Sequence, residues 1–562
     1  MMNITENKRT AARTHTAHPR IVATSHLFFW LGCIFLLSIG TTFLYGSIYL
    51  FPQHRWAMLG LEQFPIVIHN IPNMPWTDVA ENILGGFLIA HGQVQFTDFI
   101  QNHTPGITAL LGLIFSIFNA SSAVGGAETL KTTYILAIFS SSLFQLSLLL
   151  IGLRFFTKLS SASILLALTI YCLYCLVQHQ FAVPMSETML VPIVLIATLH
   201  FLNLWAGQSK IDFWQILLAL EISGLAILIG LTAAPFFFLY CVSLGLLFVL
   251  NRYIYPLPAY RDVAPPNSFL DEKFSALFCL GIAVLFCGYV LIKIDFYSLY
   301  FWNMPFNVSS FGLHPIQSLL RVFSNLEIAS SFASNFPVLS QPTFLTLLIL
   351  SVLCTKIYID FPCAVKIKWL ILLIVILMYG SFFWRVFAGY KAFPSLGLIA
   401  GMMIWVISKQ CQPKAEPNSK IGLLAGLFLI SSTILGVYFS LVVHWTQPGK
   451  EGLLQAKFNL CHLIPVTNSP CSCLISTIYG PQLFLEKDFL PCKGVYPTLP
   501  PHFFEYAPLI KVFGERYKSE PIAILNYENI PSPYIPTFFK ELIKQSDCQP
   551  FDAISDVCKY PK

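Results

Sequence analysis

Ionisable side chains are scarce in this chain, and several of them gather in one short segment, Trp76–Gly106. The segment contains Asp78, Glu81, Asp98 and His103, whereas only 11% of the 562 residues are charged. Carboxylates and a histidine can exchange protons with a reacting hydroxyl or ligate a metal ion. An acid in the first turn of a helix is equally typical of simple helix stabilisation. For Asp78 both interpretations stay open, and the elements that hold the segment must decide between them.

Two later segments add residues that could contact a substrate. Glu187 begins an expected helix in "MSETMLVPIVLI", and Arg385, Tyr390 and Lys391 occur in "FFWRVFAGYKAFPSLG". Arginine offers a two-pronged fork and lysine a point charge to a phosphate, so we favour phosphate binding by this cationic segment. The alternative is that both cations extend to the membrane surface beside aromatic residues. Arg321, in a long loop, is a weaker candidate of the same kind.

The composition indicates that these segments belong to a membrane protein. The chain is 56% hydrophobic and 11% charged, whereas a soluble domain carries roughly 25% charged residues. Many apolar runs reach the ~20 residues needed to cross a bilayer, and such a run must be helical in lipid to satisfy its own backbone. The net charge of +6 is spread over short clusters between the runs, which is typical of topology signals. We therefore expect an all-α polytopic membrane protein.

About eleven membrane-spanning helices are expected. They lie near residues 27–50, 130–152, 160–178, 188–205, 214–231, 235–250, 274–292, 342–359, 369–387, 393–408 and 421–443. The short run "PGITALLGLIFSIFNA" is expected to lie in the membrane interface instead of crossing. With a cytoplasmic N-terminus, every alternate loop carries lysines and arginines, as the positive-inside rule requires. The segments that contain Asp78, Glu187 and Lys391 then all face the outside.

Three regions follow from this pattern. Residues 1–26 form a polar cytoplasmic N-terminus, residues 27–443 the membrane domain with its first outside loop at 51–129, and residues 444–562 a small extracytoplasmic domain. The last region contains six cysteines: Cys461, Cys471, Cys473, Cys492, Cys548 and Cys558. An even set outside the cytoplasm predicts up to three disulfides. A metal site is the alternative there, although these six cysteines include no CxxC spacing. No cofactor is implied, and a divalent metal at the first outside loop stays open.

Several motifs occur in an informative order. They are Asp78, "FTDF" with Asp98, "HTPG" with His103, "MSET" with Glu187, "GLTAAP" and "FAGYKAFPSLG". In order and spacing they resemble the motifs of membrane glycosyltransferases of the C-type fold, such as the protein O-mannosyltransferases and the aminoarabinose transferases of lipid A. Two departures stand out. Val79 follows Asp78 where the family often has Glu, and Tyr390-Lys391 takes the place of a frequent His-Tyr.

The resemblance implies that the donor is a sugar linked to polyprenyl phosphate. Asp78 would be the base that activates an acceptor hydroxyl, and Arg385 and Lys391 would hold the lipid phosphate. The residues implied to shape the pocket are Glu81, Asp98, His103, Glu187 and Tyr390. The implied partners are this donor, a lipid, glycan or protein acceptor, and membrane lipids, without nucleic acid. The expected location is a bacterial inner membrane, with the C-terminus in the periplasm.

Two other functions compete with this one. A transporter would carry internal repeats and ionisable groups near the bilayer midplane, whereas here the polar residues concentrate on one side. A non-catalytic protein that only binds the lipid carrier is the second alternative, and Val79 beside Asp78 keeps it open. Replacing Asp78 by asparagine would separate an enzyme from such a binder.

Overall fold

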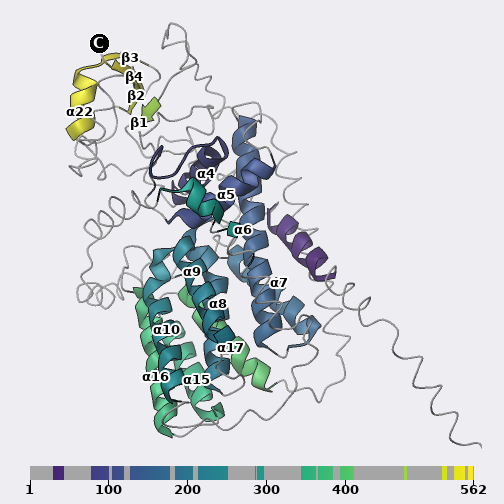
Figure 1. Ribbon diagram of the computed structural model, residues 1–562. Coiled ribbons are helices and arrows are strands. Elements are labelled where there is room, and N and C mark those ends of the chain that lie inside the picture. Colours follow the sequence, from purple (N-terminus) through teal and green to yellow (C-terminus); the bar gives the residue numbers. More distant parts are fainter. Residues whose placement is uncertain are drawn as a thin grey trace, which may run out of the picture.

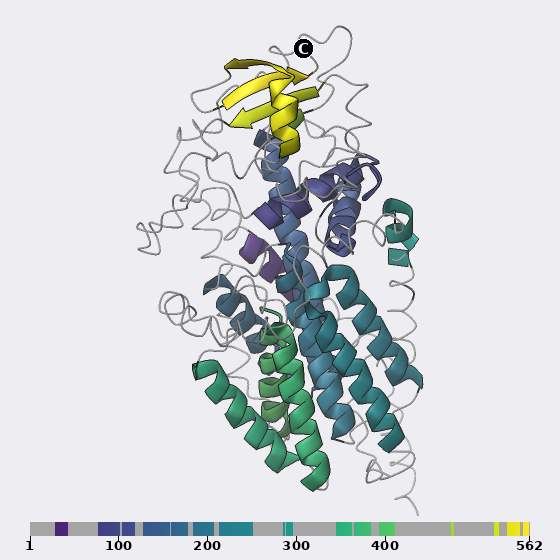
Figure 2. The same ribbon diagram turned by 90° about the vertical axis from the view of Figure 1, so that its left-hand side faces the viewer.

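The computed structural model describes the chain in segments. They are residues 29–42, 77–99, 101, 104–118, 127–157, 159–177, 184–206, 213–250, 281, 285–286, 288–295, 344–361, 365–383, 393–410, 474–476, 522–527, 537–550 and 555–560. Figures 1 and 2 show a bundle of long helices with a small sheet at one end. Of Asp78 the structure describes the backbone alone, and the predicted residues His103, Arg321, Arg385, Tyr390 and Lys391 lie outside the described segments.

The helices of the bundle follow the apolar runs of the sequence closely. They are Phe29–Thr42, α4 Thr77–Ala90, α5 Pro105–Ile117, α6 Ala127–Phe156, α7 Ser161–Val177, α8 Ser186–Trp205, α9 Phe213–Ile229, α10 Ala234–Val249, α15 Phe344–Asp360, α16 Val365–Gly380 and α17 Ser395–Gln410. Two single 3-10 turns, η2 Leu231–Ala233 and η5 Ser381–Phe383, precede α10 and follow α16. Most predicted spans therefore begin and end within a few residues of an observed helix.

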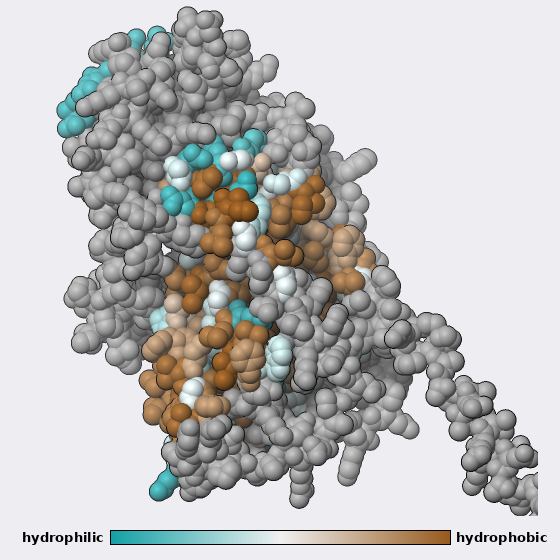
Figure 3. Space-filling model, viewed as in Figure 1, coloured by the Kyte–Doolittle hydropathy of each residue, from teal (hydrophilic) through white to brown (hydrophobic). Residues whose placement is uncertain are grey.

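In the part of the chain that the structure describes, three helical segments are long and apolar enough to cross a membrane: Ile135–Phe156, Ser186–Trp205 and Leu231–Val249. On the face shown in Figure 3, hydrophobic side chains cover the bundle and hydrophilic ones gather at the end around α4. The 13 residues of α5 span only about 20 Å at the rise of an α-helix, less than a ~30 Å hydrocarbon core. The class of a helical membrane protein is confirmed, while the number of spans stays a prediction.

Helix α8 is the centre of the bundle, and all of its residues are buried. It packs against α17, whose Gly397 and Gly401 stand four residues apart on the contact. A Cβ added at Gly397 would lie only 2.2 Å from the carbonyl oxygen of Val191. Small residues at this spacing let two membrane helices approach closely, so the sequence "GLIAG" of α17 explains the close approach of this pair.

The directions of neighbouring helices agree with a chain that crosses back and forth. The helix Phe29–Thr42 runs antiparallel to α6, because Trp30 stacks under Arg154 at one end and Thr41 bonds Ser142 at the other, with 2.7 Å between the hydroxyl oxygens. Helix α17 runs parallel to α8, since Gly397 faces Val191 and Trp405 bonds Asn203. Alternating topology gives consecutive helices opposite directions and gives α8 and α17 the same one.

The C-terminal region contains strands, so the all-α description holds for the membrane domain and not for the tail. Strands β1 Leu474–Ser476, β2 Ile522–Tyr527, β4 Ser555–Tyr560 and β3 Asp547–Pro550 form a sheet in that order. β1 pairs with β2 in parallel, and the other pairs are antiparallel. Helix α22, Thr537–Lys544, precedes β3. Both ribbon views place this sheet beyond the end of the bundle that carries α4 and α5.

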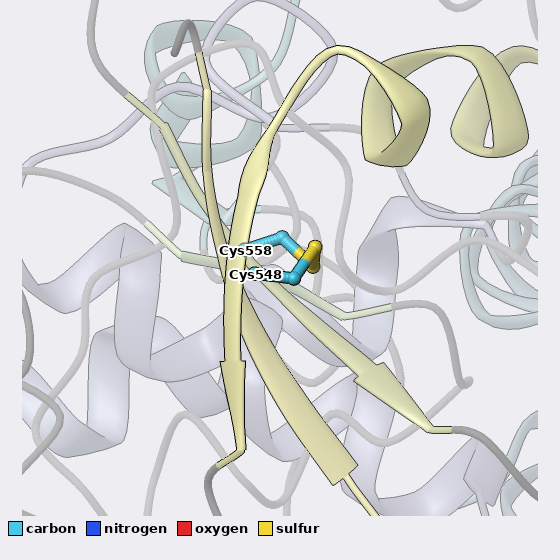
Figure 4. Close-up of a disulfide and its surroundings, with 2 residues drawn as sticks. All are labelled: Cys548 and Cys558. Atoms are coloured by element: carbon cyan, nitrogen blue, oxygen red, sulfur yellow. A yellow bond between two sulfur atoms is a disulfide. The ribbon is translucent and has the colours of Figure 1, made fainter.

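One of the predicted disulfides joins two strands of this sheet. Cys548 on β3 and Cys558 on β4 are direct partners in the register, and their sulfur atoms are bonded (Figure 4). The bond ties the edge strand β3 to the sheet, and it uses two of the six cysteines for which metal binding was the alternative. Cys461, Cys471, Cys473 and Cys492 lie outside the described residues.

Candidate functional site

Helix α4 carries the first group of candidate residues. The predicted apolar face of Val79, Ile83 and Phe87 is buried, as the helical spacing indicated. Glu81 and Asn82 are buried as well, at 0% and 1% exposure. The helix is thus enclosed on its polar side too, and Asp78 lies in the first turn of this enclosed helix. A carboxylate and an amide in such surroundings need hydrogen-bonding partners.

A buried glutamine supplies one link between α4 and the chain that follows it. The Gln101 Nε2 donates to the Glu81 carbonyl oxygen at 2.5 Å, and the Gln101 Oε1 accepts from the Gln95 Nε2 at 3.2 Å. Gly85 makes this possible, because a Cβ there would lie 2.2 Å from the Gln101 Nε2. We call Asn82, Gln95 and Gln101 the amide chain.

The turn between α4 and α5 explains the position of Asp98. Its Oδ2 accepts a hydrogen bond from the Val94 N–H at 2.9 Å, which closes a tight turn in which Phe96 has a φ of 72°. The Gln95 backbone pairs with a segment far along the chain. Its N–H donates to the Lys293 carbonyl oxygen and its carbonyl accepts from the Asp295 N–H, each at 3.0 Å. One oxygen of Asp98 therefore has a structural role in this turn.

The start of α8 meets the start of α4. The Asn82 Nδ2 donates to the Pro184 carbonyl oxygen at 2.8 Å across 102 residues of sequence. Two residues further on, Ser186 donates to the Glu187 Oε2 at 2.8 Å, and Glu187 is buried at 1% exposure. The structure thus brings the segments of two predicted site residues, Glu81 and Glu187, into direct contact.

The "HTPG" and "GLTAAP" segments arrive at the same end of the bundle. The Thr104 hydroxyl donates to the Ile229 carbonyl oxygen at 2.6 Å, just before α5 begins. The next residue after Ile229 is Gly230, where an added Cβ would lie 2.8 Å from the Cβ of Ser186 at the start of α8. These contacts therefore bring four motif segments together near the starts of α5 and α8.

The late aromatic and basic segment leads into α17, which starts beside the first half of α8. Phe393 and Leu396 pack on Val191 of α8, and Tyr171 of α7 covers them in part. Ser395, the first residue of α17, is fully buried. The described end of this segment is therefore close to the other motif segments, whereas its predicted phosphate ligands precede the described part.

The amide chain was missed from the sequence. Single asparagines and glutamines have no motif of their own, and their only signal was a concentration of amides around Asp98 in an apolar protein. No group of three or more histidines, cysteines, aspartates and glutamates that could hold a metal occurs among the described residues. The described polar groups of this end are mainly carboxylates and amides.

Comparisons with known proteins give a faint likeness in structure. No family model and no curated protein matches the chain. Among solved structures it is similar to ArnT from Cupriavidus metallidurans bound to undecaprenyl phosphate, with a TM-score of 0.41, 10% identity, and 86% of this chain and 94% of that chain covered. It is also similar to an oligosaccharyltransferase of Archaeoglobus fulgidus in complex with Zn and sulfate, with a TM-score of 0.28, 12% identity, and 87% and 67% covered. Both TM-scores are below 0.5.

Proposed function

We propose that this protein is a membrane glycosyltransferase of the C-type fold, which moves a sugar from a polyprenyl phosphate to an acceptor hydroxyl. The observation that carries the proposal is the convergence of the motif segments at one end of the bundle. Asn82 joins α4 to the chain before α8, and Thr104 joins the "HTPG" segment to the "GLTAAP" segment. A shared site is the simplest reason for four distant polar segments to meet in a protein with so few polar residues.

In this proposal Asp78 is the base. Its carboxylate takes the proton of the acceptor hydroxyl as that oxygen bonds to the anomeric carbon of the sugar. The bond from the anomeric carbon to the phosphate oxygen breaks in the same step, and polyprenyl phosphate leaves with the bonding electron pair. Arg385 and Lys391, with Tyr390 between them, stabilise the charge of the departing phosphate. Glu81, Asp98, His103 and Glu187 shape the pocket for the sugar and the acceptor.

The proposed orientation puts this end of the bundle outside the cytoplasm. Residues 1–26 are then cytoplasmic, residues 27–443 form the membrane domain, and residues 444–562 lie in the periplasm of a bacterium. The Cys548–Cys558 disulfide supports this orientation, because disulfides form and persist in oxidising compartments. The sheet of the tail lies beyond the same end of the bundle as α4 (Figure 2), so the tail is suited to cover the site or to select the acceptor.

The decisive experiment is transfer by the purified full-length protein and its Asp78→Asn variant. We expect transfer of radiolabelled sugar from a polyprenyl phosphate to a membrane extract, and a loss of about 10²–10⁴-fold in the variant, because a general base contributes that much. Asp360→Asn is the matched control, since Asp360 pairs with Lys356 at the end of α15. Equal transfer by Asp78→Asn and the wild type would contradict the role of Asp78. Donor binding without any transfer would indicate a carrier-binding protein.

A further inference from the structure

Among the described residues of the proposed site, two buried oxygens of the amide chain have no hydrogen-bond donor. They are the Asn82 Oδ1 and the Gln95 Oε1, and their residues are 1% and 0% exposed. A buried acceptor without a donor is costly, and native proteins contain only a few such atoms. Both atoms belong to the amide chain, so a single cause could account for them.

The hydrogen bonds of the amide chain determine which atom of the Asn82 and Gln95 side-chain amides has no partner. A backbone carbonyl oxygen can only accept, so Asn82 must present its Nδ2 to Pro184, and Gln101 must present its Nε2 to Glu81. The Gln101 Oε1 then faces Gln95, which must donate through its Nε2. Exchanging nitrogen and oxygen in any of the three amides would set like atoms against each other. The free atoms are therefore oxygens, and the groups missing opposite them are donors.

This polarity limits what can bind there. A phosphate offers mainly acceptors and negative charge, and Glu81, the residue before Asn82 on α4, is a buried acidic residue. A sugar ring instead carries several hydroxyl donors. We propose that Asn82 and Gln95 bind hydroxyl groups of the donor's sugar ring, at a subsite separate from the phosphate. This inference rests on the proposed function, and it assigns the neutral, hydroxylated part of the substrate to the amide chain.

A third unpartnered amide oxygen shows why the hydrogen bonds of the amide chain matter. The Gln93 Oε1 is buried without a partner as well, but no side-chain hydrogen bond among the described residues fixes the orientation of its amide. Gln145 of α6 is the opposite case. This buried glutamine donates to the Ser141 hydroxyl at 3.1 Å and accepts from the Tyr171 hydroxyl at 3.2 Å. It provides a matched control for the loss of a buried amide.

The test compares binding of glycosylated and bare carriers to the full-length protein in lipid nanodiscs. The probes are bare polyprenyl phosphate and the same carrier bearing mannose, glucose or galactose. We expect the wild type to prefer at least one glycosylated carrier. Gln95→Met and Asn82→Leu should each lower this preference roughly 10-fold, the usual effect of one lost hydrogen bond to a buried partner. Affinity for the bare carrier should stay within about twofold, and Gln145→Met should keep the preference.

Monodeoxy analogues of the preferred sugar give a second measurement that does not depend on folding of the variants. One analogue should bind the wild type roughly 10-fold more weakly than the parent sugar, and Gln95→Met or Asn82→Leu should abolish that difference. An unchanged preference in both folded variants, or equal wild-type affinity for bare and glycosylated carriers, would overturn the inference. A variant that melts at a higher temperature and keeps its preference for the glycosylated carrier would also overturn the inference. The two oxygens would then be partners of buried water. If the inference failed in one of these ways but sugar transfer still depended on Asp78, the proposed function would be unaffected.

Discussion

Two polar layers lie near the two ends of helix α8. They differ in whether the buried side-chain amides have hydrogen-bond partners for both of their polar atoms. In the layer near its C-terminal end, the His200 Nδ1 lies 2.5 Å from the Tyr240 hydroxyl, and its Nε2 lies 2.6 Å from the Gln215 Oε1. Asn203 donates to the Phe156 carbonyl oxygen at 2.7 Å and accepts from the Trp405 Nε1 at 3.1 Å. Each polar side-chain atom of His200 and Asn203 thus has a partner.

The layer at the start of α8 is built differently. Asn82 and Gln95 are as deeply buried as His200, yet each keeps one oxygen without a donor. In a low-dielectric interior a complete network fixes the packing of helices, whereas an incomplete one costs stability. The comparison teaches that burial alone does not distinguish architecture from a binding site. For these side chains the balance of donors and acceptors differs. It supports an architectural role for His200 and Asn203 and, in our proposal, a ligand-binding role for Asn82 and Gln95.

The largest effect is expected at the contact between α8 and α17. Gly397→Val would drive a side chain into the Val191 carbonyl oxygen, which is backbone and cannot move aside. We expect a destabilisation of about 3 kcal/mol or more. The measurement is the yield and the melting temperature of the purified protein. Gly245→Val on α10, where an added Cβ meets nothing within 4 Å, is the control, and equal melting of the two variants would contradict this packing.

Next in size is the complete layer. Asn203→Leu removes the acceptor of the Trp405 Nε1–H and the donor to the Phe156 carbonyl oxygen. Because the Trp405 N–H stays buried and Phe156 is partly buried, we expect a loss of about 2–3 kcal/mol. Thermal melting measures it, and transfer per folded molecule should be unchanged. A selective loss of donor binding in this variant would erase the contrast between the two layers.

The incomplete layer should respond in the opposite way. Asn82→Leu loses one hydrogen bond, to Pro184, but it also removes an unpartnered oxygen. The two effects oppose each other, so we expect a change in stability within about 1 kcal/mol together with a loss of transfer. Melting and transfer assays on the same preparation measure both. Destabilisation as large as that of Asn203→Leu would mean that the two layers have the same role.

The smallest effect is expected at a single hydrogen bond that belongs to neither layer. Thr41 and Ser142 share one hydrogen bond between the first helix and α6, and such bonds between membrane helices average about 0.6 kcal/mol. Thr41→Val keeps the shape of the side chain and should lower stability by about that amount. Melting in the same lipid as the other variants measures it. A loss above that of Asn203→Leu would show that a single bond can outweigh a complete network here.

The sequence by itself determined the class of the protein and most of its helices. Apolar runs predicted α6, α8, α9 and α10 within a few residues, because a segment in lipid must satisfy its backbone internally as a helix. Helical spacing also predicted the buried face of Val79, Ile83 and Phe87. These are local properties, set by residues within a few turns of one another. The roles of Asp78, Arg385 and Lys391 stay predictions.

Tertiary structure alone decided the features that depend on distant partners. The sheet of the tail has strands of three to six residues, too short to carry a clear alternation, and β1 pairs with a strand about fifty residues later. The choice of Cys558 as partner of Cys548 depended on the register of β3 and β4. The amide chain needed contacts across 6, 20 and 102 residues. A hydrogen bond depends on where two atoms meet in space, and the spacing of residues along the chain does not contain that information.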